Sequence, residues 1–313
     1  MINLADIQAA RRRIAPYVGL TPLVTMSVSG LRLKAESLHP IGAFKIRGAF
    51  NAILSLSDDE RRAGVVAHSS GNHAQAVAYA AMRLGVSAIV VMPSNAPATK
   101  IAGVRRAGAE IVFVGVASAE RAAEARRLAA ERGLTLIEPF DMDPIMAGTG
   151  TIGLEILEQA PEAKNVFAPV SGGGLLGGLA AAIKLTRPEV RVIGVEPALA
   201  GDAQASLRAG HIISFSAEDV ARTMADGLRV QQLGARTWPH IQAYVDDIVT
   251  VSEADIAEAM RRIAHEARLV AEPSGAVAIA GALAWPGATA HAVAVLSGGN
   301  VEPAQFARIM TQA

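Results

Sequence analysis

The stretch GVVAHSSGNHAQAVAYAAMRLGVSAIVVMP, residues 64–93, decides the fold that we expect for this chain. It begins with a short apolar run over 64–68, which has the length and composition of a buried strand. A polar loop and a helical pattern over 73–85 follow, and residues 87–93 form a second run of strand length. A strand, a helix and another strand in this order predict two parallel strands that are covered by helices.

The same alternation extends along most of the chain. Further strands are expected at 110–115, 134–140, 165–170, 190–197, 247–251 and 291–299, with helical patterns between them. Ser252 and Asp255 resemble a capping box that opens the last long helical pattern, which runs to Leu269. The pattern predicts an α/β fold with two open, twisted sheets that carry helices on both faces.

The composition excludes several classes of function. Acidic and basic residues balance at 29 each, and aromatic residues make up 4% of the chain, so neither nucleic acid nor an anionic membrane is an expected partner. The chain has no cysteine, which excludes disulfides and thiolate chemistry. The N-terminal residues lack the apolar segment of a signal peptide, and no apolar run is long enough to span a membrane. We therefore expect a soluble, cytoplasmic protein.

One lysine and three loops indicate where a ligand binds. Lys45 lies between Phe44 and Ile46, where an ammonium group is costly unless it has a partner or a chemical task. A lysine with a lowered pKa can condense with a carbonyl group, although a lysine at the edge of a helix is the simpler alternative. Small polar loops follow three of the expected strands, at 68–73, 171–178 and 296–300. Ligands of open α/β sheets bind at such strand ends, so we expect a ligand between the two sheets.

The second of these loops has two functional interpretations. Gly172, Gly174 and Gly177 form the G-x-G-x-x-G pattern between a strand and a helix, and Glu196 ends the next strand roughly twenty residues on. This pattern is typical of dinucleotide sites, so a nicotinamide-dependent oxidoreductase is an alternative, as is a tight turn without a ligand. The backbone N–H groups of such a loop also suit a single phosphate. Lys45 and the 68–73 loop favour pyridoxal phosphate, which combines an aldehyde, a phosphate and a pyridine ring.

Seven segments, in this order, resemble the threonine/serine dehydratase and serine racemase family of fold-type II pyridoxal-phosphate enzymes. They are GAFKIRGA, HSSGNHAQA, PVSGGGLLGG, EPALAGD, ADGL, EPSGAV and LSGGNV. The resemblance implies a tryptophan synthase β-like fold with the cofactor between two domains. Residues 1–50 and 145–313 would form the large cofactor-binding domain, and residues 51–144 the small α/β domain.

The resemblance also implies a role for each matched residue. Lys45 would form a Schiff base with the cofactor and act as a catalytic base, and Ser70 would deliver a proton on the opposite face in a racemase. The cofactor-binding residues would be Phe44, Lys45, Asn72, Ser171, Gly172, Gly173, Gly174, Leu175 and Ser297. The substrate-binding residues would be Ser69, Ser70, Gly71, Asn72, His73 and Arg121. Arg121 suits a distal carboxylate, although a solvated helix residue is the simpler interpretation.

A divalent cation is also implied, held by Glu196, the Ala200 carbonyl and Asp202. These are oxygen ligands, which suit Mg²⁺ or Ca²⁺, with Mn²⁺ as a further candidate, whereas two solvated carboxylates are the alternative. The predicted function is elimination of water and ammonia from L-serine, L-threonine or 3-hydroxyaspartate to give a 2-oxo acid. An amino-acid racemase is the alternative within the family, although residues 225–234 depart from the racemase pattern after Leu228. A homodimer is implied by the resemblance only.

Overall fold

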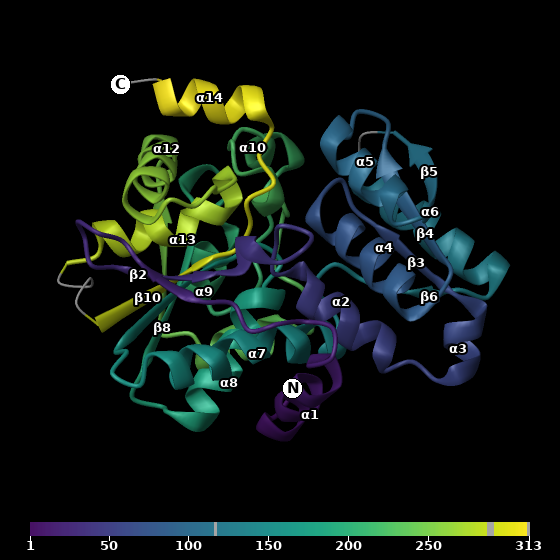
Figure 1. Cartoon of the computed structure of the whole chain (residues 1–313), viewed down its shortest axis with the longest axis horizontal. Coiled ribbons are helices and arrows are strands. Elements are labelled where there is room, and N and C mark those ends of the chain that lie inside the picture. The colour runs from purple at the N-terminus through teal and green to yellow at the C-terminus, as the bar shows by residue number, and fades with distance from the viewer. Residues whose placement is uncertain (116–117, 287–290, 312–313) are drawn as a thin grey trace.

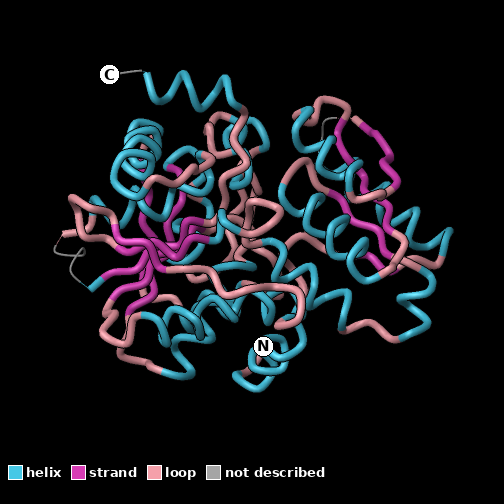
Figure 2. The backbone as a smooth tube through the Cα atoms, in the orientation of Figure 1, coloured by secondary structure: helices cyan, strands magenta, loops and turns pink. Residues whose placement is uncertain are grey.

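The chain forms two separate sheets, as the cartoon and the tube show (Figures 1 and 2). This computed structural model describes residues 1–115, 118–286 and 291–311. The strands are β1 Leu23–Thr25, β2 Arg32–Ala35, β3 Val65–His68, β4 Ala88–Pro93, β5 Glu110–Val114, β6 Thr135–Leu136, β7 Asn165–Pro169, β8 Arg191–Pro197, β9 Asp247–Val251 and β10 Ala292–Leu296.

The larger sheet has six strands in the order β1-β2-β10-β7-β8-β9. β1 pairs antiparallel with β2, and all the other pairs are parallel. Successive residues of its central strands face opposite sides, so that Val166 and Val192 pack in one core cluster and Phe167 and Ile193 in another. Helices cover both faces, because each face is apolar.

The smaller sheet has four parallel strands in the order β5-β4-β3-β6. Its two faces are also covered. Val66 and Val91 pack against the helix over 118–132, whereas Val90 and Met92 pack against the helices over 72–84 and 98–106. The predicted class, an α/β fold with two helix-covered sheets, is therefore confirmed.

Fourteen α-helices connect and cover these sheets within the described residues. They are α1 Leu4–Ile14, α2 Lys45–Leu54, α3 Asp58–Ala63, α4 Asn72–Leu84, α5 Ala98–Arg106, α6 Ser118–Arg132, α7 Asp143–Gln159, α8 Gly174–Thr186, α9 Asp202–Ala209, α10 Ala217–Ala221, α11 Trp238–Tyr244, α12 Glu253–Arg262, α13 Pro273–Ala284 and α14 Pro303–Thr311. Short 3₁₀ turns occur at η1 Glu36–Leu38, η2 Ala198–Ala200 and η3 Asp226–Leu228, and a π-helical turn, η4 Ile263–Ala267, follows α12. No helix in the described parts of the chain combines the length and the apolarity that a bilayer span requires.

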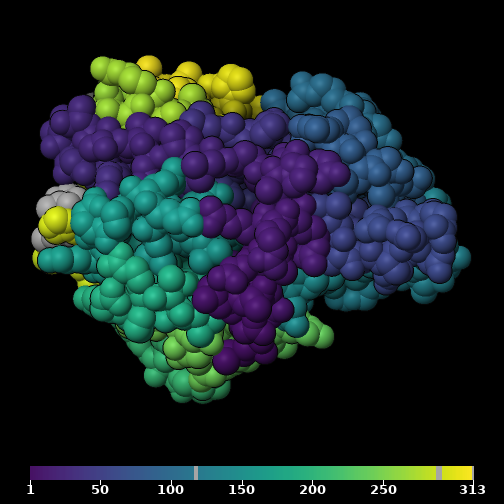
Figure 3. Space-filling view, turned by 60° about the horizontal axis from the view of Figure 1, so that its bottom comes forward, coloured from purple at the N-terminus to yellow at the C-terminus, as the bar shows by residue number. Residues whose placement is uncertain are grey.

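Helices α2 and α7 connect the two sheets. A Cβ atom at Gly148 of α7 would lie 2.8 Å from the Cα atom of Gly48 in α2, so only glycine allows the two backbones to approach this closely. The predicted domain limits at 50/51 and 144/145 fall within these two helices and stay a prediction. The N-terminal residues, purple in Figure 3, spread over the surface where the two parts of the molecule meet.

Candidate active site

Lys45 is the first residue of α2 and is attached to the end of β10 by backbone contacts. The N–H of Phe44 donates to the carbonyl of Ser297 at 3.0 Å, and the N–H of Gly299 donates to the carbonyl of Gly42 at 2.9 Å. Ala43 and Gly298 form an isolated antiparallel bridge between these hydrogen bonds. The structure therefore places the segment that contains Lys45 against the loop that contains Ser297.

The Lys45 amine has an environment that disfavours its charge. Its Nζ donates to the carbonyl of Pro139 at 2.6 Å and lies 5.3 Å from the centre of the Phe44 ring. Although part of the side chain remains exposed, burial of the amine lowers the pKa of Lys45 from 10.5 to about 8. A substantial neutral fraction at mild pH is what a nucleophilic or proton-accepting lysine requires.

Residues from two other segments contact the glycine loop after β7 and fix its position. Gly173 has a φ of +91°, which favours glycine, and it precedes the first turn of α8. The carbonyl of Gly172 accepts hydrogen bonds from Thr237 Oγ1 at 2.6 Å and from the N–H of Gly234 at 3.1 Å. A Cβ atom at Gly172 would lie 2.4 Å from the Phe140 ring, so a larger residue has no space there.

The loop has the features of a phosphate cradle. It leads into the N-terminus of α8, whose backbone N–H groups favour an anion. The hydroxyl oxygen of Ser171 is buried and has no hydrogen-bond partner among the described residues. A buried hydroxyl without a partner costs free energy, and a phosphate oxygen would satisfy it. These residues fit the phosphate of pyridoxal phosphate.

The loop over 69–71 connects β3 with α4. The N–H of Ser69 donates to the carbonyl of Val91 at 3.1 Å, and Ser69 Oγ accepts from the N–H of Gly71 at 3.1 Å. His73 is buried, with Nε2 2.9 Å from the Ile137 carbonyl oxygen, and burial lowers its pKa to about 3. His73 is thus neutral and fixes the first turn of α4. Ser70 is half-buried in the same loop.

The side-chain amide of Asn72 is oriented from both sides. Its Nδ2 donates to Glu272 Oε1 at 2.5 Å, and its Oδ1 accepts from Asn300 Nδ2 at 2.8 Å. Asn300 Nδ2 also donates to the Ile41 carbonyl at 2.8 Å, next to the Lys45 segment. Burial raises the pKa of Glu272 to about 7. Sequence reasoning included Glu272 and Asn300 in its matched segments but assigned neither of them a role.

A salt bridge joins the two parts of the molecule beside this loop. Lys100 Nζ of α5 lies 2.5 Å from Asp226 Oδ2 in η3. The same amine is close to the loop over 69–71, since a Cβ atom at Gly71 would lie 3.3 Å from it. Asp226 lies in the matched segment ADGL, but neither residue was assigned a role from the sequence, because nothing in either segment indicates a partner that is more than a hundred positions away.

Glu196 and Asp202, two of the three predicted cation ligands, are both buried. Glu196 is the penultimate residue of β8 and accepts hydrogen bonds from the N–H groups of Ala203 and Gln204, at 3.3 and 2.6 Å. Burial and then the charge of Asp202 raise the pKa of Glu196 well above its ordinary value, and burial raises that of Asp202 to about 7. Asp202 Oδ2 is buried without a hydrogen-bond partner among the described residues, and Ala200 lies in η2, between Glu196 and Asp202 in the sequence. This arrangement fits a cation.

Arg121 lies in the first turns of α6 and is half-buried, and burial lowers its pKa. Nowhere among the described residues do three or more acidic, histidine or cysteine side chains group as a metal site. A cation at Glu196 and Asp202 would therefore depend on carbonyl oxygens and water for its remaining ligands.

The fold and the site together define an α/β protein in which a glycine loop suited to an anion leads into α8, and in which burial lowers the pKa of Lys45. The family described as "Pyridoxal-phosphate dependent enzyme" matches residues 14–298, and the chain belongs to this family. The predicted membership of the fold-type II enzymes is confirmed, and the pyridoxal phosphate interpretation of the glycine loop is favoured over the dinucleotide one.

Three similar proteins illustrate the range of the family. The chain is 41% identical to a serine racemase of Oryza sativa subsp. indica, with 96% of this chain and 91% of that protein covered. It is 40% identical to an L-threo-3-hydroxyaspartate ammonia-lyase of Saccharomyces cerevisiae, with 98% and 95% covered. A crystal structure of a T.th. threonine deaminase superimposes with a TM-score of 0.90 at 46% identity, covering 96% of this chain and 99% of that one. The ammonia-lyases among these relatives support the predicted lyase class.

Proposed function

We propose that this chain is a pyridoxal-phosphate-dependent ammonia-lyase that converts a 3-hydroxy amino acid to a 2-oxo acid and ammonia. The observation that carries the proposal is the Lys45 amine, whose lowered pKa suits both cofactor attachment and proton transfer. Serine and threonine are the first candidate substrates. The 3-hydroxyaspartate ammonia-lyase among the relatives adds that substrate as a further candidate.

The residues that would hold the cofactor come from the ends of β3, β7 and β10 and from the start of α2. Lys45 would bind its aldehyde, the loop Ser171–Leu175 its phosphate, Asn72 its ring oxygen and Ser297 its pyridine nitrogen, with Phe44 packed beside the ring. When bound, the cofactor supplies an electron-withdrawing ring that weakens the bonds to the substrate Cα atom. Ser297 offers a neutral hydroxyl, which favours departure of a leaving group from the β carbon over prolonged storage of charge in the ring.

The remaining steps fall to side chains of this chain. The Lys45 amine, once free, would remove the proton from the substrate Cα atom, since burial already favours its neutral form. The loop Ser69–His73 would receive the substrate carboxylate through its N–H groups and hydroxyls. Arg121 would bind the second carboxylate of 3-hydroxyaspartate by a bidentate contact.

A racemase is the second candidate, and the serine racemase among the relatives favours it. In that reaction Ser70 would return a proton to the Cα atom on the face opposite Lys45. The homodimer and the cytoplasmic location stay predictions.

A panel of amino acids tests the proposed function. Purified enzyme is incubated with L-serine, D-serine, L-threonine and the isomers of 3-hydroxyaspartate, and 2-oxo acid, ammonia and inversion at Cα are measured. We expect equal amounts of 2-oxo acid and ammonia from at least one of these substrates, and none from L-alanine, which lacks a β-hydroxyl. Absence of 2-oxo acid from the whole panel would contradict the proposal, and inversion alone would select the racemase.

We also propose that Glu196, the Ala200 carbonyl and Asp202 hold a divalent cation, Mg²⁺, Ca²⁺ or Mn²⁺. A cation would stabilise the two carboxylates, whose mutual repulsion and burial are otherwise unfavourable. Millimolar Mg²⁺ or Ca²⁺ added to EDTA-treated protein should raise the melting temperature by on the order of 5 °C. Asp202→Asn should remove this response, whereas Glu158→Gln, on the exposed side of α7, should keep it. A melting temperature and an activity that are both insensitive to EDTA would exclude the site.

A further inference from the structure

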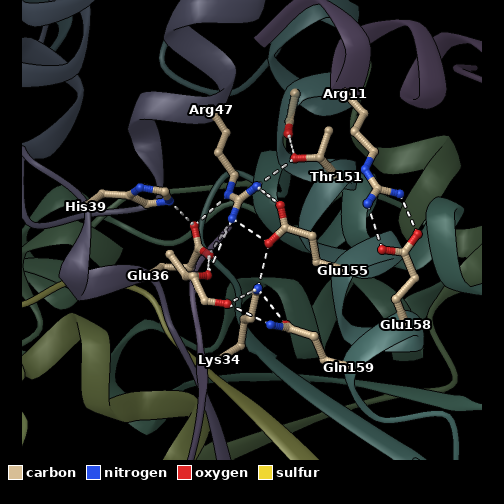
Figure 4. Close-up of polar contacts among 11 residues, drawn as sticks. Arg11, Lys34, Glu36, His39, Arg47, Thr151, Glu155, Glu158 and Gln159 are labelled. Atoms are coloured by element: carbon tan, nitrogen blue, oxygen red, sulfur yellow. Dashed lines mark hydrogen bonds and ion pairs between the residues drawn. The ribbon is translucent and has the colours of Figure 1, made fainter. Parts of the chain in front are cut away.

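A cluster of buried charges lies directly behind the lysine site. Figure 4 shows Lys34 of β2, Glu36 of η1, Arg47 of α2 and Glu155 of α7 converging from four elements, and we call these four residues the buried ion cluster. All four side chains are buried, and the cluster contains two cations and two carboxylates. The proposed chemistry uses none of them.

Arg47 is the centre of the cluster, because it forms two bidentate ion pairs. Its Nε and Nη2 donate to the two carboxylate oxygens of Glu36 at 2.7 and 2.8 Å. Its Nη1 and Nη2 donate to those of Glu155 at 2.6 and 2.8 Å. Glu155 also pairs with Lys34 Nζ at 2.5 Å, which balances the charge. The planar guanidinium is thus fixed in position and orientation, as a lysine at this site would not be.

Side chains outside the buried ion cluster satisfy its remaining hydrogen bonds. Thr151 Oγ1 accepts from Arg47 Nη1 at 3.1 Å, and Thr21 Oγ1 donates to Glu36 Oε1 at 2.6 Å. His39 Nε2 lies 3.1 Å from Glu36 Oε2. Burial alone would raise the pKa of Glu36, but ion pairing with Arg47 and the contact with His39 lower it below its ordinary value. Glu36 therefore favours its ionised form, and all three nitrogens of the Arg47 guanidinium are hydrogen-bonded.

Stability alone does not account for such a cluster. Removing four charges from water is unfavourable, and buried ion pairs can often be replaced by apolar residues without loss of stability. A buried ion pair is better suited to selecting one geometry, because its hydrogen bonds tolerate little displacement. The buried ion cluster is therefore expected to fix one arrangement of the elements that carry it.

The position of Arg47 on α2 indicates which arrangement the cluster fixes. Successive helical residues are rotated by about 100°, so Arg47 projects from the side of α2 nearly opposite to Lys45, two residues earlier. The contacts agree with this geometry, since Lys45 contacts Pro139 whereas Arg47 contacts Glu36 and Glu155. The close approach of Gly148 to Gly48 fixes the distance between α7 and α2 at the next residue. Arg47 thereby sets the rotation of the first turn of α2.

We propose that Arg47, held by Glu36 and Glu155, is a positioning residue that aims the Lys45 amine at the cofactor aldehyde. The proposal rests on the proposed function of Lys45. It predicts that loosening the Arg47 contacts disturbs cofactor attachment and proton transfer while the protein remains folded.

The test uses two variants and one matched control. Arg47→Met combined with Glu36→Gln removes one pair of opposite charges and leaves the Lys34–Glu155 pair intact. Arg47→Lys keeps the positive charge but loses the planar guanidinium group that forms the two bidentate ion pairs. The control is Arg11→Gln combined with Glu158→Gln, which removes a pair that also joins α7 to a neighbouring helix but is 41% and 55% exposed (Figure 4). Circular dichroism and melting curves establish that each variant is folded.

The readouts are the dissociation constant of pyridoxal phosphate, the pH midpoint of its bound visible band, and kcat and KM. For Arg47→Met/Glu36→Gln we expect the dissociation constant of pyridoxal phosphate to rise and kcat to fall, each by about 10- to 100-fold. The pH midpoint of the visible band should also shift. Arg47→Lys should show a smaller change in the same direction, and the control none.

Wild-type affinity, midpoint and kcat in either folded variant would overturn the inference. Failure of both variants to fold would also overturn it, since the cluster would then serve the fold rather than Lys45. Failure of the proposed function is distinguishable, because the wild-type protein would then give no 2-oxo acid from the substrate panel, whereas the inference concerns the difference in cofactor binding between wild type and variants.

Discussion

Lys45→Ala is expected to lose cofactor attachment and nearly all activity. The substitution removes the amine that would bind the aldehyde and also the base that would act at Cα. Loss of both roles should lower kcat/KM by about 10³-fold or more. The 2-oxo acid assay measures the activity, and the visible band of the bound cofactor should be absent from the dialysed variant.

Reductive labelling identifies the attachment point directly. The wild-type holoenzyme is treated with borohydride and digested with trypsin, and mass spectrometry locates the cofactor adduct, which we expect on Lys45. Lys184→Ala is the control, because this lysine lies at the end of α8 and pairs with Asp246. An adduct on another lysine, or none in a coloured protein, would refute the assignment.

The pH dependence of cofactor capture tests the same amine. Only a neutral amine attacks an aldehyde, and burial lowers the pKa of Lys45 to about 8. The rate at which the cofactor-free protein captures pyridoxal phosphate should therefore increase as pH rises through about 8, rather than through the ordinary lysine value of 10.5. Stopped-flow absorbance between about pH 6.5 and 9.5 records this midpoint, in steps of about half a unit.

Ser70→Ala is the second large effect that we expect. If Ser70 delivers a proton to the face opposite Lys45, its loss should reduce any racemisation by at least about 10²-fold. Elimination from the L-enantiomer should remain within about tenfold of wild type, since Lys45 still removes the proton. Chiral chromatography of serine and the 2-oxo acid assay give the two rates in one reaction.

Solvent deuterium provides the control for this variant. Wash-in of deuterium at Cα of L-serine reports proton removal by Lys45 and should persist in Ser70→Ala. Racemisation at the wild-type rate would show that another group donates the second proton.

The fold was predictable where strands and helices have distinct apolar patterns. Residues 64–93 became β3, α4 and β4 because the two strands are short, continuous apolar runs that are buried on both faces, whereas the helix between them is longer and has a polar side. The capping box at Ser252 and Asp255 is confirmed. The strand expected over 134–140 is shorter in the structure, because β6 includes only Thr135 and Leu136. The chain then leaves the sheet, and the carbonyl of Pro139 accepts a hydrogen bond from Lys45. The predicted helix to Leu269 ends as a π-helical turn, and Arg268 adopts a φ of +59°.

The site was predictable only in part, and the roles of its residues stay predictions. Lys45, Asn72 and the glycine loop belong to compact local patterns that single out their positions. Glu272, Asn300 and Lys100 act through partners that are distant in the chain, so no local pattern reveals them. Pro139 contributes a backbone carbonyl, which every residue possesses. The sequence shows that Arg47 is charged but not that it is buried. Its burial depends on Glu36 and Glu155, which approach it from different elements.

The contact between Gly48 and Gly148 has a consequence for how this enzyme can vary. The polypeptide leaves the six-stranded part along α2 and returns along α7 at nearly the same point in space. A segment whose two ends lie together can be exchanged between relatives without moving its surroundings. Recombination at these two crossings would thus exchange the 69–73 loop and Arg121 as one segment, while Lys45 and residues 171–175 stay in place. The exchanged segment also carries Asn72, Pro139 and Phe140, so new substrate contacts would have to arrive with residues that still fit the amine and the glycine loop.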